Sequence, residues 1–333
     1  MLRTFLLAVI VPLLLGADAP VTLKLSSPSP ERSPWGKGLV DVAAAVQKQT
    51  DGRVRIKLYP GGIQGDERTV LRKLRVDQLQ GAAFLNTGMT QICPDSSALK
   101  LPLLFRTEAE VDFLLSRMAD DFDAQARGNG FRLMGFPHLG FSSLYSSKRV
   151  ATIEDLQASR PWLVEDDPLV REFYSVLKVT PESLGLPDVL PALQSGLIGG
   201  VFAPPAGLIA LQWHPHVRFQ LDLAINYGVG IVVISDQGWQ RVAEGDREIV
   251  RRCFADGIAQ MNRAVAQQNA DSLAVIRESG IALVSITAES LTRLQAATAE
   301  VTKKFTGDLY RPEVLLRIES LLSEFRSREG QKP

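Results

Sequence analysis

Residues 160–168 read Arg-Pro-Trp-Leu-Val-Glu-Asp-Asp-Pro and bring one arginine, one tryptophan and three consecutive acids into a short span. Clustered carboxylates can serve acid–base chemistry or bind calcium. Adjacent side chains of a strand or helix point in different directions, so the three acids are not expected to converge on one ion. Asp167 directly precedes Pro168, a pair typical of a helix N-terminus. We therefore interpret Asp167 as a helix cap, which leaves open whether Trp162 lies in the core or faces a ligand.

The three histidines and two cysteines offer little for metal or redox chemistry. His214 and His216 could hold a metal from an extended segment, but two ligands without a neighbouring carboxylate or cysteine make a weak site, and we favour a surface or hinge position. Cys93 and Cys253 lack metal-ligand and redox spacing; they could form one disulfide or remain buried thiols. We expect no metal and no cofactor.

Motifs of the common enzyme classes are missing from the sequence. It contains no G-x-S-x-G, no H-E-x-x-H, no P-loop and no G-x-G-x-x-G after a strand. The 37 basic and 37 acidic side chains cancel, and no basic stripe with interleaved aromatics occurs. These observations argue against an enzyme and against a nucleic-acid partner.

The first 20 residues have the pattern of a secretory signal. One arginine precedes an apolar run from Phe5 to Leu15, which is too short to cross a bilayer, and Ala17 and Ala19 follow with A-x-A spacing. We expect a signal peptide over residues 1–19, cleavage close to Ala17 or Ala19, and a mature protein in the periplasm. An uncleaved anchor is the alternative.

Apolar periodicity predicts the elements that position these residues. Strand-like alternation over residues 21–25 and 54–58 flanks a helical segment that begins after Ser33, which is a β-α-β start. The pattern continues along the chain, with Asp66 and Thr107 as further helix caps. Strands that alternate with helices imply mostly parallel sheets covered on both faces.

The length of 333 residues exceeds that of one core and predicts two domains. We expect one lobe over residues 20–140 plus about 227–267, and a second over 141–226 plus about 268–325, joined by crossing strands. Residues 246–280 have a helical pattern longer than a normal globular helix. This helix is expected to run past both lobes.

Five stretches carry a family resemblance: residues 53–84, 99–112, 152–164 and 190–205, and the long helix with the tail that follows it. The first reads RVRIKLYPGGIQGDERTVLRKLRVDQLQGAAF and the fourth LPALQSGLIGGVFAPP, and these two are the most distinctive. In order and content the stretches resemble the extracytoplasmic solute-binding subunits of tripartite ATP-independent periplasmic (TRAP) transporters, the DctP-like proteins. The resemblance covers essentially the whole chain after the signal.

The resemblance implies an α/β, two-lobed periplasmic-binding-protein fold, with two mixed sheets flanked by helices and a long helix that spans both lobes. It also implies a small-molecule ligand held between the lobes, closure upon that ligand, and TRAP membrane permease subunits as partners. The periodicity agrees with this geometry, because α/β proteins bind small ligands outside the carboxyl ends of their parallel strands.

Two departures from the family pattern bear on the ligand. Trp162 stands where the organic-acid binders carry the arginine that pairs with the ligand carboxylate, and Gly199 replaces an acid in the run GLIGGV. Both changes resemble a branch of the family that takes hydrophobic ligands, some of whose members pair with a TPR-repeat lipoprotein. We therefore expect an apolar or weakly polar ligand. The alternatives are a carboxylate binder that uses Arg160 or Lys148, and an envelope interaction protein that has lost its ligand.

The remaining candidates for the cleft come from positions that match the family. About half of them are expected to touch the ligand, because pocket walls are largely apolar and aromatic residues more often pack in cores. The ligand-binding candidates are Trp162, Trp35, Asn86, Thr87, Phe105, Phe141, Pro204 with Pro205, Trp213, Tyr227 and Arg160.

Overall fold

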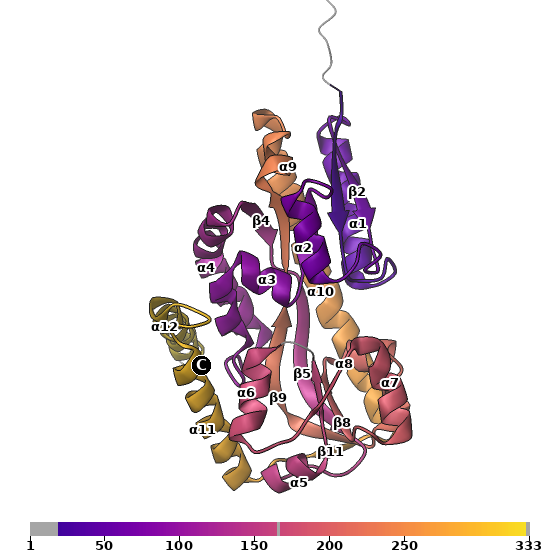
Figure 1. Ribbon diagram of the computed structural model, residues 1–333, viewed down its shortest axis with the longest axis vertical. Helices are drawn as coiled ribbons and strands as arrows, with labels where there is room; N and C mark the ends of the chain where they lie inside the picture. The colour runs from indigo at the N-terminus through magenta and orange to yellow at the C-terminus, as the bar shows by residue number, and fades with distance from the viewer. Residues whose placement is uncertain (1–18, 165–166, 331–333) are drawn as a thin grey trace, which may run out of the picture.

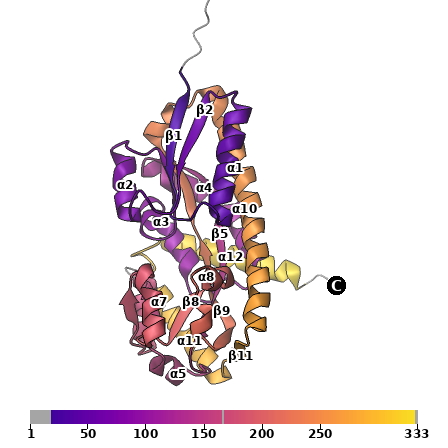
Figure 2. The same ribbon diagram turned by 90° about the vertical axis from the view of Figure 1, so that its right-hand side faces the viewer.

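The computed structural model describes residues 19–164 and 167–330. Two lobes lie one above the other along the longest axis of the molecule (Figure 1). Strands β5 (His138–Ser146) and β9 (Phe219–Val229) run between the lobes. Helix α10 (Glu244–Glu278) follows both lobes along one side, as Figure 2 shows. The predicted two-lobed α/β fold with a long spanning helix is confirmed.

The sheet of the first lobe has five strands in the order β2-β1-β3-β10-β4. Their bounds are Val54–Tyr59, Val21–Ser26, Gly81–Phe84, Ile231–Ser235 and Phe131–Gly135. Strands β1, β2 and β3 are parallel, whereas β10 is antiparallel to both of its neighbours. Strand β10 is therefore central in this sheet, although the chain reaches it after passing through the second lobe.

Each face of this sheet is covered by helices, because its strands alternate between two apolar cores. Ala83 and Val232 pack with α1 and α10, whereas Phe84 and Val233 pack with α2, α3 and α4. The bounds of these helices are Pro34–Gln49 for α1, Glu67–Arg75 for α2, Thr87–Ile92 for α3 and Glu108–Gly128 for α4; the 3₁₀ helix η1 spans Pro94–Lys100 and the short helix α9 spans Asp236–Gln240.

The sheet of the second lobe has the order β11-β9-β5-β8. Strand β11 spans Ala282–Val284 and β8 spans Gly200–Ala203. Only the β11–β9 pair is parallel; β5 is antiparallel to both β9 and β8. The expectation of mostly parallel sheets is thus wrong for this lobe, because β5 runs antiparallel to both of its neighbours.

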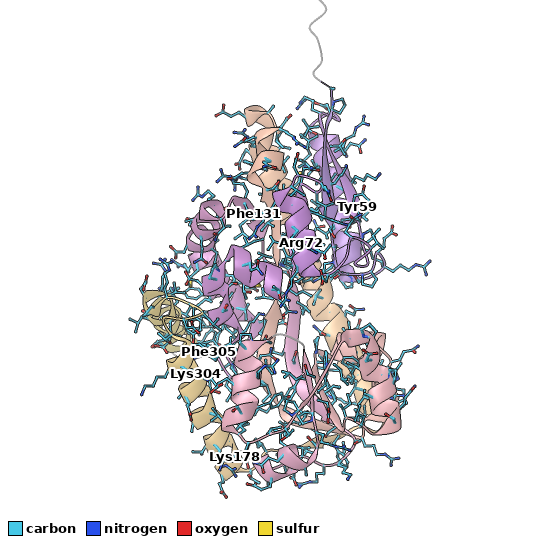
Figure 3. The ribbon with its side chains drawn as sticks, viewed as in Figure 1. Tyr59, Arg72, Phe131, Lys178, Lys304 and Phe305 are labelled. Carbon is cyan, nitrogen blue, oxygen red and sulfur yellow. The ribbon has the colours of Figure 1, made fainter. Side chains whose placement is uncertain are left out.

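A separate parallel pair, β6 (Trp162–Val164) with β7 (Glu182–Leu184), lies beside that sheet. The helices of the second lobe are α5 (Ile153–Ala158), α6 (Pro168–Val176), α7 (Leu186–Ser195), α8 (Pro205–Ala210), η2 (His214–His216) and α11 (Ala288–Phe305). Lys304 and Phe305 are the last two residues of α11 (Figure 3). The Lys304 ammonium lies 2.6 Å from the carboxylate of Glu172 on α6.

The helix caps predicted from the sequence are confirmed. Ser33, Asp66, Thr107 and Asp167 each accept hydrogen bonds from backbone N–H groups of the first turn that follows. These caps satisfy donors that a helix leaves without an internal partner. Asp167 accepts from two such groups and begins α6, with Pro168 as its first residue. The other two acids of that cluster, at 165 and 166, lie outside the described residues.

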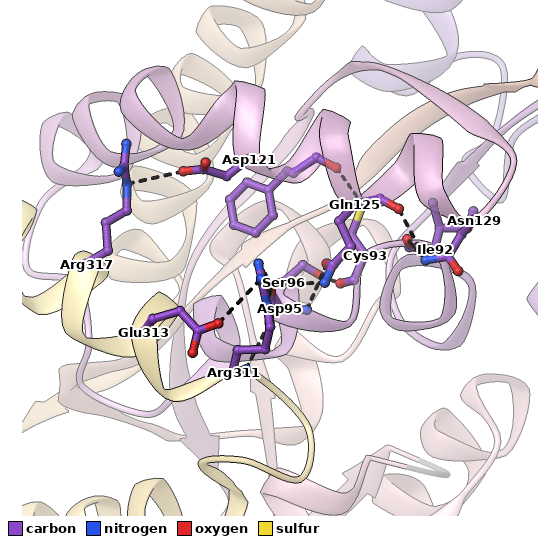
Figure 4. Close-up of polar contacts among 11 residues, drawn as sticks. Ile92, Cys93, Asp95, Ser96, Asp121, Gln125, Asn129, Arg311, Glu313 and Arg317 are labelled. Atoms are coloured by element: carbon purple, nitrogen blue, oxygen red, sulfur yellow. Dashed lines mark hydrogen bonds and ion pairs between the residues drawn. The ribbon is translucent and has the colours of Figure 1, made fainter.

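The C-terminal helix α12 (Pro312–Glu329) packs on the first lobe. Arg326 of α12 pairs with Glu110 of α4 at 2.8 Å. Near its start, Arg311 pairs with the buried carboxylate of Asp95 in η1, which also accepts from Gln125 of α4 (Figure 4). The second lobe was expected to extend over about residues 268–325, and these contacts connect the α12 end of that segment to elements of the first lobe.

Candidate ligand-binding cleft

Two adjoining cavities lie between the lobes, where the chain passes from β3 to α3 on one side and from β8 to α8 on the other. The outer cleft has a volume of about 670 Å³ and the inner cleft about 230 Å³. Both are lined by Leu85, Asn86, Leu139, Trp162, Phe202 and Pro204. The outer cleft adds Asp66, Glu67, Arg68, Thr87 and Trp213, among others. The inner cleft adds Lys100, Asp167, Tyr174, Asn226 and Tyr227, among others.

A larger groove of about 940 Å³ lies elsewhere, between α11, α12 and residues 101–104. It is lined by leucines, threonines and charged side chains, and none of its lining residues belongs to β5 or β9, the strands that join the lobes. We therefore take the inner and outer clefts as the candidate ligand site.

Trp162 belongs both to the core and to the wall of the cleft. Its side chain is 8% exposed, and its indole N–H donates to the Leu184 carbonyl over 2.9 Å. The ring meets Trp213 edge to face, with ring centroids 5.4 Å apart. Edge-to-face packing is a favourable geometry for aromatic rings. Together with the hydrogen bond, it fixes the orientation of the Trp162 ring, which lines both clefts. At this largely buried position, the indole gives the wall of both clefts an apolar surface.

The floor of the inner cleft rests on Tyr227 of β9. Phe105 and Phe141 pack edge to face against its ring, at centroid distances of 6.3 and 4.8 Å. The Tyr227 hydroxyl lies 3.0 Å from Nδ1 of His138, the first residue of β5. Phe105 and Phe141 thus support Tyr227 from behind and do not line either cleft.

Burial shifts the acid–base behaviour of this aromatic cluster. It lowers the pKa of His138, an effect that the carboxylate of Asp112, 3.9 Å from Nε2, partly offsets. It raises the pKa of Tyr227, to which the charges of Glu108 and Asp112 add. Both groups are therefore neutral at pH 7, so the floor of the cleft carries no charge.

The polar group of the inner cleft is an ion pair that the sequence did not reveal. The Lys100 ammonium lies 3.6 Å from Oδ2 of Asp167 and 3.2 Å from Oδ1 of Asn86. Lys100 ends η1 in the first lobe, whereas Asp167 begins α6 in the second. Sequence reasoning identified Asp167 only as a cap, and no local signal distinguished Lys100 from an ordinary surface lysine.

The turn after β3 already holds a carboxylate from the protein itself. Glu67 at the start of α2 accepts hydrogen bonds from the backbone N–H groups of Leu85, Asn86 and Gly88, with the shortest at 2.7 Å. These donors would otherwise suit an anionic ligand. Asn86 and Thr87 do line the cleft, as expected, but this part of its edge is already supplied with negative charge.

Besides Phe105 and Phe141, three more of the predicted candidates line neither cleft. Trp35 is a core residue whose indole N–H donates to the His138 carbonyl over 2.7 Å. Arg160 is exposed in a left-handed turn with φ of 45°, and its guanidinium donates to the Gly196 carbonyl. Pro205 begins α8 and lines neither cavity, unlike Pro204. Lys148, which was considered as an alternative cation, is also exposed and lines neither cavity.

Close packing of the backbone requires glycine at position 199, which the sequence did not indicate. A Cβ atom at this position would lie 2.4 Å from the carbonyl oxygen of Ser159, to which the Gly199 N–H donates. Any side chain would therefore displace the turn that precedes β6 and carries Arg160. Gly199 lines neither cleft, so its lack of a carboxylate says little about the ligand.

The structure also places the cysteines and the other side chains that could bind a metal. No group of three histidine, cysteine, aspartate or glutamate side chains in the described part of the chain could hold a metal ion. Cys93 and Cys253 are both buried and unpaired, and burial raises the pKa of Cys93 to about 12. Of the two alternatives for these residues, buried free thiols are thus the correct one. None of the described helices has the length and apolar character needed to cross a bilayer.

Comparison with known proteins agrees with this geometry. Residues 25–308 match the sequence model of the family "bacterial extracellular solute-binding protein, family 7", DctP. The sialic acid-binding periplasmic protein SiaP of Vibrio cholerae is 21% identical over 307 residues, which cover 89% of this chain and 92% of SiaP.

Two solved structures share the fold. A TRAP periplasmic solute-binding protein from Ochrobactrum anthropi, with its C-terminus bound in its ligand-binding pocket, superposes with a TM-score of 0.85 at 21% identity, covering 93% of this chain and 97% of the other. Another, from Xanthobacter autotrophicus with bound β-D-galacturonate, has a TM-score of 0.81 at 18% identity and covers 90% of this chain and 99% of the other.

Proposed function

Because the chain belongs to the family 7 bacterial extracellular solute-binding proteins, the binding subunits of TRAP transporters, we propose that its inter-lobe cleft binds a small, mainly apolar organic solute. Proteins of this family bind solutes outside the cytoplasm for membrane permease subunits and are not enzymes. The proposal concerns the chemical class of the solute and the residues that hold it.

The wall formed by Trp162 is the observation that carries the proposal. Trp162 and Trp213 offer an aromatic surface on the second lobe, and Tyr227 closes the inner cleft with a neutral ring. Apolar walls with a few placed polar groups are typical of sites for small organic molecules. A carboxylate buried against these rings without a free cation would lose its hydration at a cost of at least several kcal/mol.

The charged residues of the two clefts support the same solute class. Among the described lining residues, three carry carboxylates and two carry cations. The carboxylates are Asp66, Glu67 and Asp167, and the cations are Arg68 and Lys100. An excess of negative charge repels small organic acids and does not attract them.

A second candidate function is carboxylate binding through Lys100. Two observations favour it: Lys100 lines the inner cleft, and relatives of this chain are a sialic acid-binding protein and a structure with bound galacturonate. Arg160 and Lys148, considered earlier for this role, do not line either cavity.

Native mass spectrometry of the purified protein, followed by solvent extraction of any co-purified compound, tests the proposal directly. Calorimetry then compares small dicarboxylates, sugar acids, monocarboxylates and uncharged lipophilic molecules. We expect binding of uncharged apolar molecules and little or no binding of dicarboxylates and sugar acids. Micromolar binding of a small acid that Lys100→Gln abolishes would favour the second candidate.

The proposal also includes export of the protein to the periplasm. The segment from residue 1 to 19 is proposed to be a signal peptide, so that the mature protein works in the periplasm, and N-terminal sequencing of exported protein should begin close to residue 18 or 20. An intact Met1 would contradict this. A TPR-repeat lipoprotein is proposed as a further partner, and co-purification from envelope extracts tests it.

A further inference from the structure

The ion pair between Lys100 and Asp167 joins the two lobes at the inner cleft. Lys100 is the last residue of η1 in the first lobe, and Asp167 caps α6 in the second. Their side chains are 17% and 14% exposed, and both line the inner cleft. The pair is therefore largely shielded from solvent, and a solute in this cleft lies beside it.

The two oxygens of the Asp167 carboxylate have separate tasks. Oδ1 accepts hydrogen bonds from the backbone N–H groups of Leu169 and Val170, at 3.1 and 3.3 Å. Oδ2 is the oxygen that faces the Lys100 ammonium. An asparagine can keep the first task, since asparagine caps a helix as well as aspartate does, but it cannot supply the negative charge. The charge of Asp167 can thus be removed without removing the cap.

Asp167 neutralises the positive charge of the Lys100 ammonium, but the ammonium can still donate a hydrogen bond to a ligand. An ammonium has three N–H donors, and the described residues supply it with one hydrogen bond, to Asn86, besides the ion pair with Asp167. A ligand carboxylate at this point would lie next to the Asp167 carboxylate, and two carboxylates that share a buried site repel each other. A carbonyl, amide or hydroxyl oxygen meets no such repulsion.

We infer that Asp167 determines charge selectivity in the inner cleft: by neutralising Lys100 it excludes organic acids, and the cleft takes an uncharged molecule with an apolar body and one hydrogen-bond acceptor. The inference rests on the proposed function, because it names the polar group of the solute whose apolar body contacts Trp162. It also makes Asp167 the residue whose charge decides between the two candidate functions.

The test compares two probes of nearly equal shape, 3-phenylpropionamide and 3-phenylpropionate, by calorimetry. The wild-type protein should bind the amide more tightly than the acid. In Asp167→Asn, Lys100 gains an uncompensated charge, so affinity for the acid should rise by about tenfold or more, the order of a charge-assisted hydrogen bond, while affinity for the amide changes by less than about threefold. Asp167→Ser, which also caps helices, should show the same direction.

Two controls make the comparison specific. Asp222→Asn removes one negative charge from an exposed position of β9 that lines neither cleft, and it should leave both affinities unchanged. In the double variant Lys100→Gln with Asp167→Asn, the gain for the acid should vanish, because the gain acts through Lys100. Thermal unfolding of each variant verifies that the fold persists.

The inference is overturned if wild-type protein binds the acid as tightly as the amide, if Asp167→Asn leaves the ratio of the two affinities unchanged, or if neither probe binds to any variant. The proposed function has a separate readout. A compound of any charge that co-purifies with the wild-type protein but not with the Trp162→Ala variant supports solute binding, even when the charge inference fails. If no compound co-purifies and no molecule of the wider panel binds, solute binding itself is contradicted.

Discussion

The indole of Trp162 donates its N–H to Leu184 and packs against Trp213, and it also borders both clefts. Replacement with alanine should weaken solute binding by about 1 to 3 kcal/mol, the usual contribution of a buried aromatic contact. Calorimetry with the co-purified solute measures this loss. The same change should lower the free energy of unfolding by about 3 to 5 kcal/mol, because it leaves a cavity in the core.

Two other variants separate these effects. Trp162→Phe keeps an aromatic wall and loses the hydrogen bond to Leu184, so it should lower stability by about 1 kcal/mol and retain most of the affinity. Arg160→Ala should leave the affinity unchanged, because Arg160 is exposed and lines neither cleft. Loss of binding in Arg160→Ala with unchanged binding in Trp162→Ala would contradict the assignment of the wall.

His138 should make the stability of the protein depend on pH. Burial holds its pKa below the ordinary value near 6.5, so below that pH the unfolded chain binds more protons than the folded one. The contribution of His138 is therefore fully present above pH 6.5 and is lost as the pH falls toward the folded-state pKa. Urea unfolding at pH 7.5 and 5.0 measures the decline, which should be smaller in His138→Gln. Equal declines in both proteins would show that other groups cause it.

At the scale of single residues, the sequence predicted part of the lining of the candidate clefts. Trp162, Asn86, Thr87, Pro204, Trp213 and Tyr227 line the clefts, and Trp35, Phe105, Phe141 and Arg160 do not. Which aromatic side chains lie in the first layer and which lie behind it depends on tertiary packing, and the local pattern is the same for both. The partner of Lys100 could not be predicted either, because it lies 67 positions away in the other lobe.

At the scale of elements, the turn before β6 depends on the small size of Gly199. Gly199→Ala should lower the free energy of unfolding by about 1 to 3 kcal/mol, because the added Cβ would lie 2.4 Å from the Ser159 carbonyl oxygen and the backbone must shift. Gly245→Ala in α10 is the matched control, since no atom lies within 4 Å of the added Cβ there. The control should be neutral or slightly stabilising. Chemical denaturation compares the two variants, and equal effects would exclude the steric reason.

The attachment of α12 to the first lobe depends on Asp95, whose side chain is 4% exposed. Arg311→Met removes the cation that neutralises this carboxylate (Figure 4), and it should lower stability by about 1 to 3 kcal/mol, less than for a fully buried pair because Arg311 is half exposed. Hydrogen exchange in α12 should become faster. Arg317→Met removes an exposed pair with Asp121 and should change stability by less than about 0.5 kcal/mol. Slower or unchanged exchange in Arg311→Met would contradict the role of the pair.

The elements were easier to predict than their pairing. Caps at Ser33, Asp66 and Asp167 follow from local chemistry, so the starts of α1, α2 and α6 were correct. The antiparallel pairing of β5 with β9 brings together segments about 80 residues apart, and apolar alternation does not encode strand direction. The place of α12 likewise depends on distant partners, Glu110 and Asp95.

At the scale of the whole molecule, ligand binding should favour closure. The lobes are joined by β5, β9 and α10, and the candidate cleft is lined by residues of both lobes, so a solute gains its full contacts only when both sides meet it. Small-angle X-ray scattering should show a smaller radius of gyration with the solute than without it. An unchanged radius with a solute of proven affinity would indicate a rigid cleft and would also argue against the proposed division into lobes that move.

The central place of β10 in the first sheet has a consequence for how the protein is made. A ribosome delivers residues 231–235 roughly 5 to 20 s after β4, because about 100 residues separate them and synthesis proceeds at about 5 to 20 residues per second. Until then β3 and β4 have no strand between them, and the first lobe cannot complete its core. A nascent chain cannot complete this sheet during that time, which is compatible with the export proposed above. During the same delay, the edges of β3 and β4 that later pair with β10 are unpaired and open to non-native strand pairing, which favours aggregation.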